Sequence, residues 1–195
     1  WVRAPGEIYF KSSASYLTSR ELYDAQGRAK PLLGIGGAYT SGRFRELASA
    51  LYVEYGLSRA ITVVGGWALK SVRVGGVAVS GGAALSETAT GPGDLRLALR
   101  WRVLGGATVA ALQPEIKVPL SNPADRRAFQ PDLGSGAADF GAGLEVGGAL
   151  PGVHGYWTGG GGYRLRGGRA PDEAFWDVEA GVDAGARLKL RARYD

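Results

Sequence analysis

The sequence predicts an all-β fold, and three observations lead to that prediction. Apolar and polar residues alternate with period two along most of the chain, which is typical of strands that have one apolar and one polar face. Glycine makes up 33 of 195 residues, without a collagen period and among Leu, Val, Trp and Tyr. The longest uncharged stretch, residues 146–163, contains Pro151 and four consecutive glycines and would make a very poor helix. If the chain crosses a membrane, we expect it to do so with strands.

Composition sets further limits. A length of 195 residues suits one domain, which we assign to residues 1–195. The absence of Cys excludes a disulfide framework, a thiolate metal site and a Cys nucleophile. The chain contains no Met and begins at Trp1, so we expect that a signal peptide has been removed. The net charge of +5, carried mostly by Arg, is compatible with an anionic partner but does not identify one.

The clearest strand is predicted at residues 94–103. Its odd positions, from Leu95 to Val103, are all apolar, whereas Asp94 and three arginines occupy the other face. A helix would scatter these arginines around its circumference. The same split predicts about eight more strands, each near ten residues, the length of a tilted membrane-spanning strand. They lie at residues 7–16, 46–55, 60–70, 110–118, 139–150, 154–166, 176–184 and 187–194. Pro114 removes a ladder donor, so we expect a bulge or a break there.

The connections between the predicted strands alternate in length. Short ones are expected at 56–59, 104–107, 150–153 and around Gly185, and longer ones at 19–43, 72–92, 119–137 and 167–174. Strict alternation is typical of an outer-membrane barrel, which has tight periplasmic turns and longer external loops. Residues 31–40 also alternate in polarity, but a strand there would break this rhythm. We therefore assign them to the first long loop.

The aromatic residues help to decide which face is which. A soluble barrel such as a lipocalin also alternates, with its apolar residues inside. Here the large aromatics of the apolar face fall near the strand ends, with smaller aliphatics between them, as in the two interfacial girdles of a membrane barrel. The predicted girdles are Phe10, Tyr55, Trp101 and Trp157 at the short-turn end, and Tyr16, Phe140, Tyr163, Trp176 and Tyr194 at the other end. The sequence therefore predicts an antiparallel up-and-down transmembrane β-barrel in the cell outer membrane, with its N-terminus periplasmic.

The polar face then lines the lumen. Antiparallel pairing is expected to bring Arg164 near Asp177, Asp183 near Arg187, and Glu179 near Arg191. Two interpretations stay open: structural ion pairs that fill a narrow interior, or an arginine-lined path that selects solutes. The glycines of this face permit strong coiling of a small barrel or reflect a codon bias. The predicted lumen-lining charged residues are Glu46, Glu54, Lys70, Arg96, Arg100, Arg102, Glu115, Lys117, Asp139, Glu145, Arg164, Arg166, Asp177, Glu179, Asp183, Arg187, Lys189, Arg191 and Arg193.

Three segments carry a family resemblance. Residues 91–102 (GPGDLRLALRWR) resemble a "GxGDLxLxL[KR][YW][RK]" strand of Gram-negative outer-membrane transporter barrels of the phenol-degradation MetA-pathway type. Residues 53–62 are similar to that family's EYGLT hairpin, and residues 162–173 to its GYRxR strand and loop. Residues 1–11 resemble its mature N-terminus. The resemblance covers nearly the whole chain in order, and it implies passage of small, often hydrophobic molecules across the outer membrane.

The chain departs from that family in length. Family members are usually longer and end on an aromatic C-terminal strand, whereas this chain ends at Asp195. About nine strands are visible, and bacterial single-chain barrels normally have an even number. We therefore expect ten to twelve strands in the complete protein, with C-terminal strands lacking here.

Catalytic signatures are weak. His154 is the single histidine and follows a predicted periplasmic turn, away from the outer rim where a barrel enzyme acting on the outer leaflet would need its base. No nucleophile elbow, P-loop, HExxH or EF-hand pattern occurs. Asp177 and Glu179 could be compared with a glycosidase pair, but they share one strand beside arginines, which favours ion pairing. We expect no enzyme activity, no cofactor and no metal.

The leading prediction for function is an outer-membrane channel or transporter for small solutes, including hydrophobic ones. The alternative is a pore-less structural barrel that anchors or docks a larger envelope assembly, and a soluble barrel binder is a third possibility. Expected partners are outer-membrane lipid, lipopolysaccharide, small-molecule solutes and other envelope proteins. Lipopolysaccharide phosphates would contact basic loop residues. We expect no nucleic-acid partner, because the basic residues alternate with apolar ones instead of forming one patch. The basic loop residues are Arg20, Arg28, Lys30, Arg43, Arg45, Arg126 and Arg127.

Overall fold

The structure, a computed structural model, describes residues 2–24, 26–32, 39–78, 84–121, 130–168, 170–185 and 188–194. All regular secondary structure in these segments is β-strand. None of these segments contains a helix of the length and apolar character that crossing a membrane would require. The all-β prediction is therefore confirmed.

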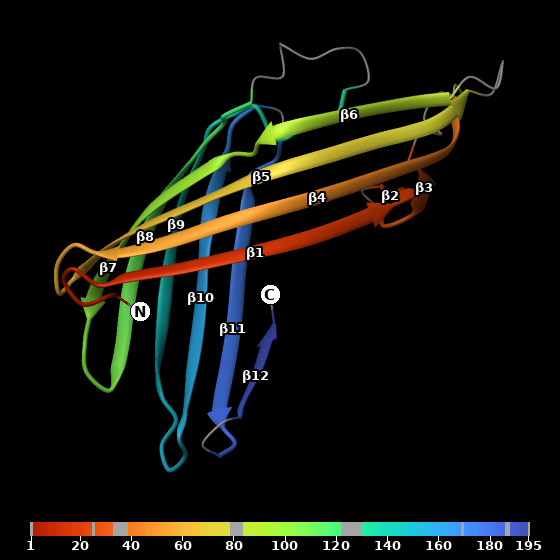
Figure 1. The fold of residues 1–195 in the computed structure, drawn as a ribbon. Helices are drawn as coiled ribbons and strands as arrows, with labels where there is room; N and C mark the ends of the chain where they lie inside the picture. Colours follow the sequence, from red (N-terminus) through yellow and green to blue (C-terminus); the bar gives the residue numbers. More distant parts are fainter. Residues whose placement is uncertain are drawn as a thin grey trace.

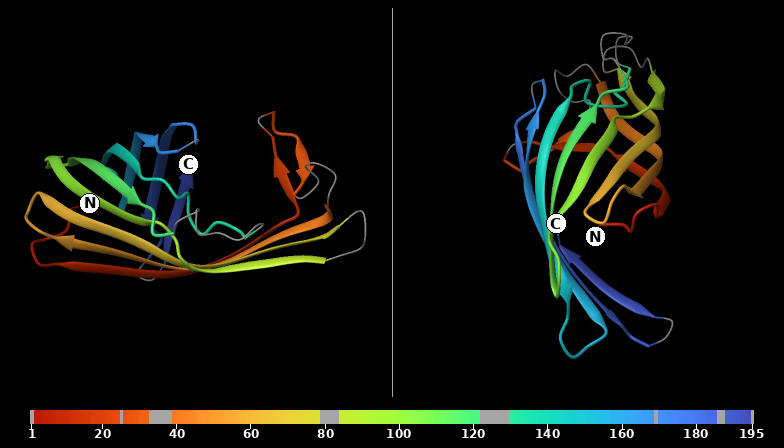
Figure 2. Two further views of the ribbon diagram at one scale, coloured as in Figure 1. Left: turned by 90° about the horizontal axis from the view of Figure 1, so that it is seen from above. Right: turned by 90° about the vertical axis from the view of Figure 1, so that its left-hand side faces the viewer.

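The strands form one large antiparallel sheet and one small hairpin (Figure 1). The sheet follows chain order from first strand to last, the up-and-down topology that the sequence predicts, and it curves into a half-barrel (Figure 2). Its path is β1 (Ile8–Ser19), β4 (Tyr39–Gly56), β5 (Ile61–Ala78), β7 (Leu95–Leu104), β8 (Thr108–Val118), β9 (Asp139–Ala149), β10 (Gly155–Arg166), β11 (Glu173–Asp183) and β12 (Lys189–Tyr194). Off this path, β6 (Ala84–Pro92) pairs with β5, and β2 (Glu21–Tyr23) pairs with β3 (Ala29–Pro31).

The expected long loop at 72–92 is wrong. Strand β5 continues to Ala78, and β6 pairs with its second half, from Leu69 opposite Pro92 to Val77 opposite Ala84. Strand β7 pairs with the first half of β5, so β6 and β7 follow one another along the same neighbour. Small residues dominate β6, and their weak polarity contrast concealed the strand. In Figure 1, β4, β5 and β6 extend together away from β8–β12.

The first long loop also contains more structure than expected. Residues 19–43 include the β2–β3 hairpin and the beginning of β4 at Tyr39. Of the segment 31–40, residues 33–38 lie outside the described residues. The strict alternation of short and long connections is therefore wrong, since β11 begins at Glu173 and also shortens the connection after β10.

The disruption expected at Pro114 is found in part: β8 is neither bulged nor broken there, but its pairing with β7 is interrupted beside the proline. Strand β8 runs through Pro114, which lies opposite Ala142 of β9. The register with β7 is the same on both sides of the proline, Ala98 opposite Glu115 and Trp101 opposite Leu112, with no ladder pair between them. The missing N–H therefore falls where β7 and β8 are not bonded. The register shift of this pair lies between Arg102 and Leu104 instead.

The two faces of the sheet differ in chemistry. The outer, convex face carries large apolar side chains that are exposed, such as Phe140 (56%), Trp101 (52%) and Leu47 (57%). The inner, concave face buries charged groups, including Glu54, Arg100, Lys117 and Asp139, each 3–7% exposed. A soluble barrel shows the reverse arrangement, with apolar residues inside and charges in water.

Candidate functional site: the charged inner face

Cross-strand register places the predicted lumen-lining charges on the inner face. One row shows this directly, since residues opposite each other in neighbouring strands share a face. It runs Glu54, Val64, Ala98, Glu115, Gly141, Arg164, Glu173 from β4 to β11. Glu46, Lys70, Arg96, Arg100, Arg102, Lys117, Asp139, Glu145, Arg166, Asp177, Glu179, Asp183, Arg191 and Arg193 occupy the same face by the same registers. Lys189 lies opposite Asp183, and Arg187 lies outside the described residues.

Arg100 on β7 is the centre of a polar cluster near the short-turn end. Its Nη1 lies 2.8 Å from Oε1 of Glu54, and its Nε donates to Oε1 of Gln113 at 2.9 Å. The second carboxylate oxygen of Glu54 accepts a hydrogen bond from Nε of Arg3 at 2.6 Å. The Tyr52 hydroxyl donates to Glu54 at 2.7 Å. Glu54 is therefore compensated by two cations and a hydroxyl, as a buried carboxylate requires.

The N-terminal segment covers this end of the inner face. The backbone N–H of Arg3 donates to the Thr62 hydroxyl at 2.8 Å, and Gly6 N–H donates to the Gly56 carbonyl at 2.8 Å. A Cβ on Gly56 would stand 1.9 Å from the Ala4 carbonyl oxygen, so only glycine fits there. The hydrogen bond to Glu54 holds the pKa of Arg3 above its ordinary value. Sequence reasoning missed Arg3, because it precedes the first alternating segment.

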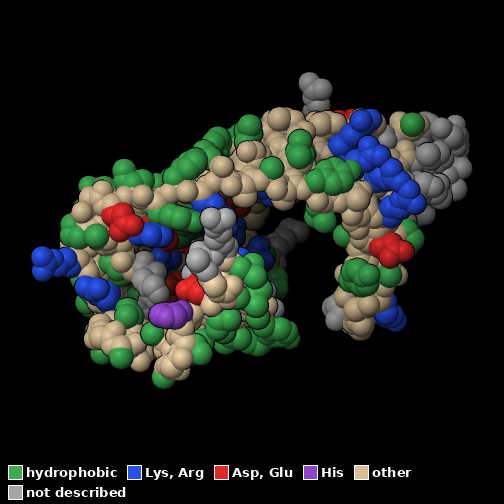
Figure 3. All heavy atoms as spheres, turned by 60° about the horizontal axis from the view of Figure 1, so that its bottom comes forward, with side chains coloured by type: hydrophobic (Ala, Val, Ile, Leu, Met, Phe, Trp, Pro, Cys, Tyr) green, Lys and Arg blue, Asp and Glu red, His purple; other side chains and the backbone are tan. Residues whose placement is uncertain are grey.

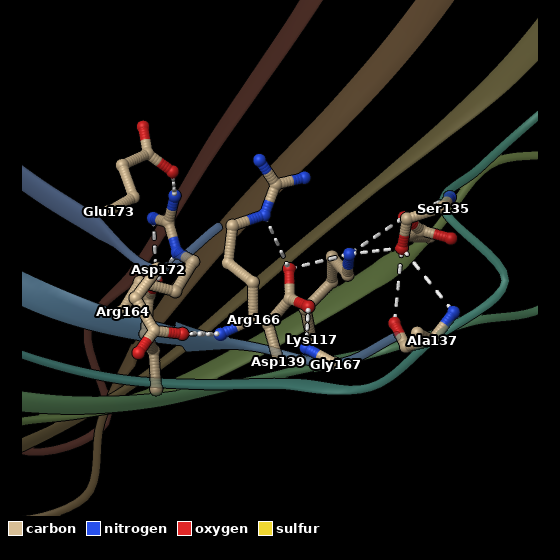
Figure 4. A network of polar contacts seen from close by, with 11 residues as sticks. Lys117, Ser135, Ala137, Asp139, Arg164, Arg166, Gly167, Asp172 and Glu173 are labelled. Atoms are coloured by element: carbon tan, nitrogen blue, oxygen red, sulfur yellow. Dashed lines mark hydrogen bonds and ion pairs between the residues drawn. The ribbon is translucent and has the colours of Figure 1, made fainter. Parts of the chain in front are cut away.

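A second cluster surrounds Arg164 of β10, towards the opposite end. Its Nε and Nη2 both bond Oε1 of Glu115, at 2.9 and 2.7 Å, and its Nη1 bonds Glu173 at 2.9 Å (Figure 4). Its guanidinium also lies over the Phe175 ring, 5.3 Å from the centroid. Glu115 lies two strands away from Arg164, with Gly141 of β9 between them. The glycine leaves the space through which the ion pair forms.

Lys117 and Asp139 form a third group beside it. The Lys117 Nζ lies 2.6 Å from Asp139 and 3.4 Å from Asp94, and it bonds the Ser135 hydroxyl. Asp139 also accepts a hydrogen bond from the Gly167 N–H at 3.0 Å (Figure 4). Both charged side chains are less than a tenth exposed. The group ties β8, β9 and the β10–β11 connection together.

The segment of residues 130–138, here called the inner segment, lies against the inner face. The Ser135 N–H donates to Asp94 at 3.1 Å, and a Cβ on Gly134 would stand 2.1 Å from the Asp94 Oδ1. A Cβ on Gly91 would stand 3.0 Å from the Leu133 side chain. Between the inner segment and the sheet is a hollow of about 420 Å³. Its lining includes Lys70, Arg96, Lys117, Asp132 and Arg166.

Aromatic side chains of the inner face lie over glycines of neighbouring strands. A Cβ on Gly162 would stand 2.6 Å from Cζ of Phe175, and one on Gly181 would stand 2.4 Å from the Tyr156 ring. The Tyr156 hydroxyl donates to Glu179 at 2.5 Å. These glycines therefore have a packing role in addition to the coiling that the sequence suggested. Glu173, Phe175 and Tyr156 are further inner-face residues that sequence reasoning did not select.

The expected ion pairs have mixed outcomes. Arg164 near Asp177 is wrong, because Arg164 lies opposite Glu173 and Asp177 opposite Gly160. Strand β11 begins three residues earlier than expected, which shifts the register. Glu179 and Arg191 do approach, with 3.9 Å between Oε2 and Nε. Arg193 lies 3.9 Å from Asp177, so the acidic pair of β11 faces arginines of β12.

The nine predicted girdle aromatics all lie exposed on the outer face. Trp176 and Tyr194 pack against each other with ring centroids 5.2 Å apart. Figure 3 shows hydrophobic side chains spread over much of the surface in view. The nine are Phe10, Tyr16, Tyr55, Trp101, Phe140, Trp157, Tyr163, Trp176 and Tyr194.

Within the described segments, no group of three or more His, Cys, Asp or Glu side chains could hold a metal ion. His154 is exposed in the turn between β9 and β10. Comparison of the chain with protein-family models, with curated proteins and with solved structures found no match.

Proposed function

We propose that this chain is the membrane-spanning sheet of an outer-membrane β-barrel that conducts small solutes. One observation carries the proposal: the outer face is apolar and exposed, whereas the inner face buries paired charges. Monomeric soluble proteins rarely expose a continuous apolar surface of this kind. Lipid would cover it, and the charges would face an aqueous interior.

The height of the apolar surface supports a bilayer as the cover. On β1, β4 and β5 it extends from the row of Ile8 and Tyr55 to the row of Tyr16 and Leu47. This is eight residue steps, or about 26 Å along the strand. For a strand tilted by about 40°, that length corresponds to about 20 Å along the membrane normal, comparable with the apolar band of an outer-membrane barrel, which is about 25 Å tall. Aromatic residues stand in both end rows, as expected of interfacial girdles.

Transport is supported by the inner face. The inner face carries charges of both signs, distributed over β4, β5 and the strands from β7 to β12, and a hollow of about 420 Å³ remains between the sheet and the inner segment. Its basic lining residues include Lys70 and Arg96, and Arg96 has no ion-pair partner among the described residues. A water-filled path with exposed cations would favour anionic solutes. The motif resemblance to transporter barrels supports the same proposal.

A pore-less structural barrel is the second candidate, and two observations favour it. The N-terminal segment bonds Glu54 and Thr62 across one end of the inner face. The inner segment bonds Asp94 nearer the other end. Together they narrow the interior at two levels, and such a barrel would serve as an anchor or docking unit in the envelope.

Either candidate imposes a structural requirement. Strands β1 and β12 are the two ends of the sheet path, and each pairs with one neighbour, β4 and β11 respectively. An unpaired strand edge exposed to lipid is prohibitively unfavourable. In a bilayer, both edges must therefore be hydrogen-bonded, either to each other or to other strands.

The experiment is single-channel recording after insertion of the full-length protein into a planar bilayer, with salt gradients of both signs. Stable unitary steps with a reproducible reversal potential would support the channel. Silence from protein that is shown to be folded and inserted would contradict transport and support the structural barrel. Failure to insert, with the folded protein extracting into buffer without detergent, would overturn both membrane proposals.

A further inference from the structure

The outer face changes from apolar to basic within one row of the sheet. The row of Tyr16, Leu47 and Ser71 is followed, two residues further from the short turns, by Thr18, Arg45 and Arg73. The next row contains Arg43 opposite Gly75. These arginines therefore share a face with the apolar band and lie directly beyond it. Figure 3 shows Lys and Arg side chains gathered over the elongated end of the sheet.

Arg45 and Arg73 stand directly opposite each other on β4 and β5. Like charges in this position destabilise a sheet, because opposed Cβ atoms are only about 5 Å apart. Both side chains are exposed, and neither has an ion-pair partner among the described residues. Arg73 is oriented by two hydrogen bonds, from Nε at 3.1 Å and Nη2 at 2.9 Å, to the Ser86 hydroxyl. An anion between the two guanidinium groups would convert the repulsion into attraction.

A hollow lined by Arg45, with Arg73 outside its lining, offers the space beside this pair. It has a volume of about 580 Å³ and lies between the β2–β3 hairpin and strands β1 and β4. Its lining includes Tyr16, Arg20, Arg43 and Arg45, with Glu21 as the one acidic residue. Tyr16 belongs to the predicted girdle, so the hollow begins where the apolar band ends.

We propose that Arg20, Arg43, Arg45 and Arg73 bind the phosphate groups of a phosphorylated glycolipid head group in the outer leaflet. The acyl chains of such a lipid lie along the apolar band, and its phosphates reach the level of the arginines. Guanidinium groups bind phosphate through paired, charge-assisted hydrogen bonds. This site rests on the proposed membrane location, and it names the lipid chemistry at one position of the outer face.

Binding of diphosphoryl lipid A to the detergent-solubilised full chain tests the site, with native mass spectrometry for affinity and thermal unfolding as a second readout. The double variant Arg45→Gln/Arg73→Gln should bind about thirtyfold more weakly. Each cation near an anionic head group contributes about fivefold to the affinity, and the two contributions multiply. Arg59→Gln, in the short turn at the opposite end of β4 and β5, is the matched control and should bind like wild type. If the double variant fails to fold, Arg45→Gln alone is used, with a smaller loss expected.

Three further measurements separate binding of a lipid head group from binding of free phosphate and from membrane insertion. Dephosphorylated lipid A should bind weakly to every variant, and inorganic phosphate alone should leave the unfolding temperature unchanged. Equal binding of diphosphoryl lipid A to wild type and the double variant would overturn the site, as would an equal effect of inorganic phosphate. Insertion into phosphatidylcholine bilayers is measured separately. Wild-type protein that inserts but does not distinguish the two lipids disproves only the site, whereas protein that does not insert disproves the membrane location.

Discussion

The guanidinium of Arg164 on β10 bonds the carboxylate of Glu115 on β8, at 2.7 Å, across the intervening strand β9. Gly141 occupies the position between them, and a Cβ there would stand 2.9 Å from Cγ of Glu115. The ion pair therefore depends on the absence of a side chain in a third strand. Such bridges hold alternate strands of the inner face together.

Replacing Gly141 should break this bridge. In Gly141→Val, the new side chain displaces Glu115 and leaves Arg164 with Glu173 alone, so we expect a loss of about 1–3 kcal/mol in the free energy of unfolding. Urea unfolding in lipid vesicles measures it. Gly65→Ala is a suitable control, because its Cβ meets only Leu97 at 3.9 Å. Equal stability of the Gly141 variant and wild type would mean that the bridge contributes little.

The glycine run of β10 offers a matched pair of variants. In Gly162→Ala, the new Cβ would stand 2.3 Å from the Ala142 carbonyl oxygen and 2.6 Å from the Phe175 ring, so we expect destabilisation of about 1–3 kcal/mol. In Gly159→Ala, the nearest atom lies at 3.6 Å, and stability should change by less than about 0.5 kcal/mol. Thermal unfolding of both variants measures these two changes in stability. A similar loss in the two would show that the run acts through backbone flexibility rather than close packing.

The inner segment should control conductance if the barrel conducts. Asp94→Ala removes the acceptor of the Ser135 N–H and one partner of Lys117, so the inner segment should detach from the sheet. We expect larger unitary currents than wild type, measured in planar bilayers. Gly105→Ala, in the turn between β7 and β8, provides the control. Unchanged current amplitude in Asp94→Ala would show that the inner segment does not limit the path.

Acid should loosen the β2–β3 hairpin through Asp24. Its carboxylate accepts hydrogen bonds from the Arg28 and Gln26 backbone N–H groups, at 2.9 and 3.0 Å, and lies 3.1 Å from Lys30. The Arg28 hydrogen bond is the largest cause that holds the pKa of Asp24 below its ordinary value. A lowered pKa in the folded state means that this stabilisation is present above pH 3.8 and is lost as pH falls through the lowered value.

Limited proteolysis of the hairpin across this acidic range measures the effect. A pepsin-type protease suits the low pH, and Asp24→Asn, cleaved under the same conditions, corrects for the pH dependence of the protease itself. The ratio of the wild-type rate to the Asp24→Asn rate should rise as pH falls. A ratio that stays constant would contradict the stabilising role of the Asp24 carboxylate.

Strand identity and strand faces could be predicted from the sequence, because period-two alternation is a local property. Residues 94–103 show this best: their odd positions are apolar, and in the structure they form the outer face of β7. The exposure of the predicted girdle aromatics on the outer face, from Phe10 to Tyr194, followed from the same pattern. Strand β6 was missed because its Ala, Ser, Thr and Gly residues give weak alternation, and it is recognisable only by its pairing with β5.

The partners within the inner face were decided by tertiary structure. Register depends on where each turn closes, and the early start of β11 gave Arg164 the partner Glu173 instead of Asp177. Arg3 joined the cluster at Glu54 because the N-terminal segment folds over the strand ends, at a sequence separation of 51 residues. Alternation specifies which face a side chain occupies, but distances across several strands depend on pairing, turn length and the glycines between them. For this reason the sequence determined the two faces of the sheet, and the folded chain determined which charges meet on the inner one.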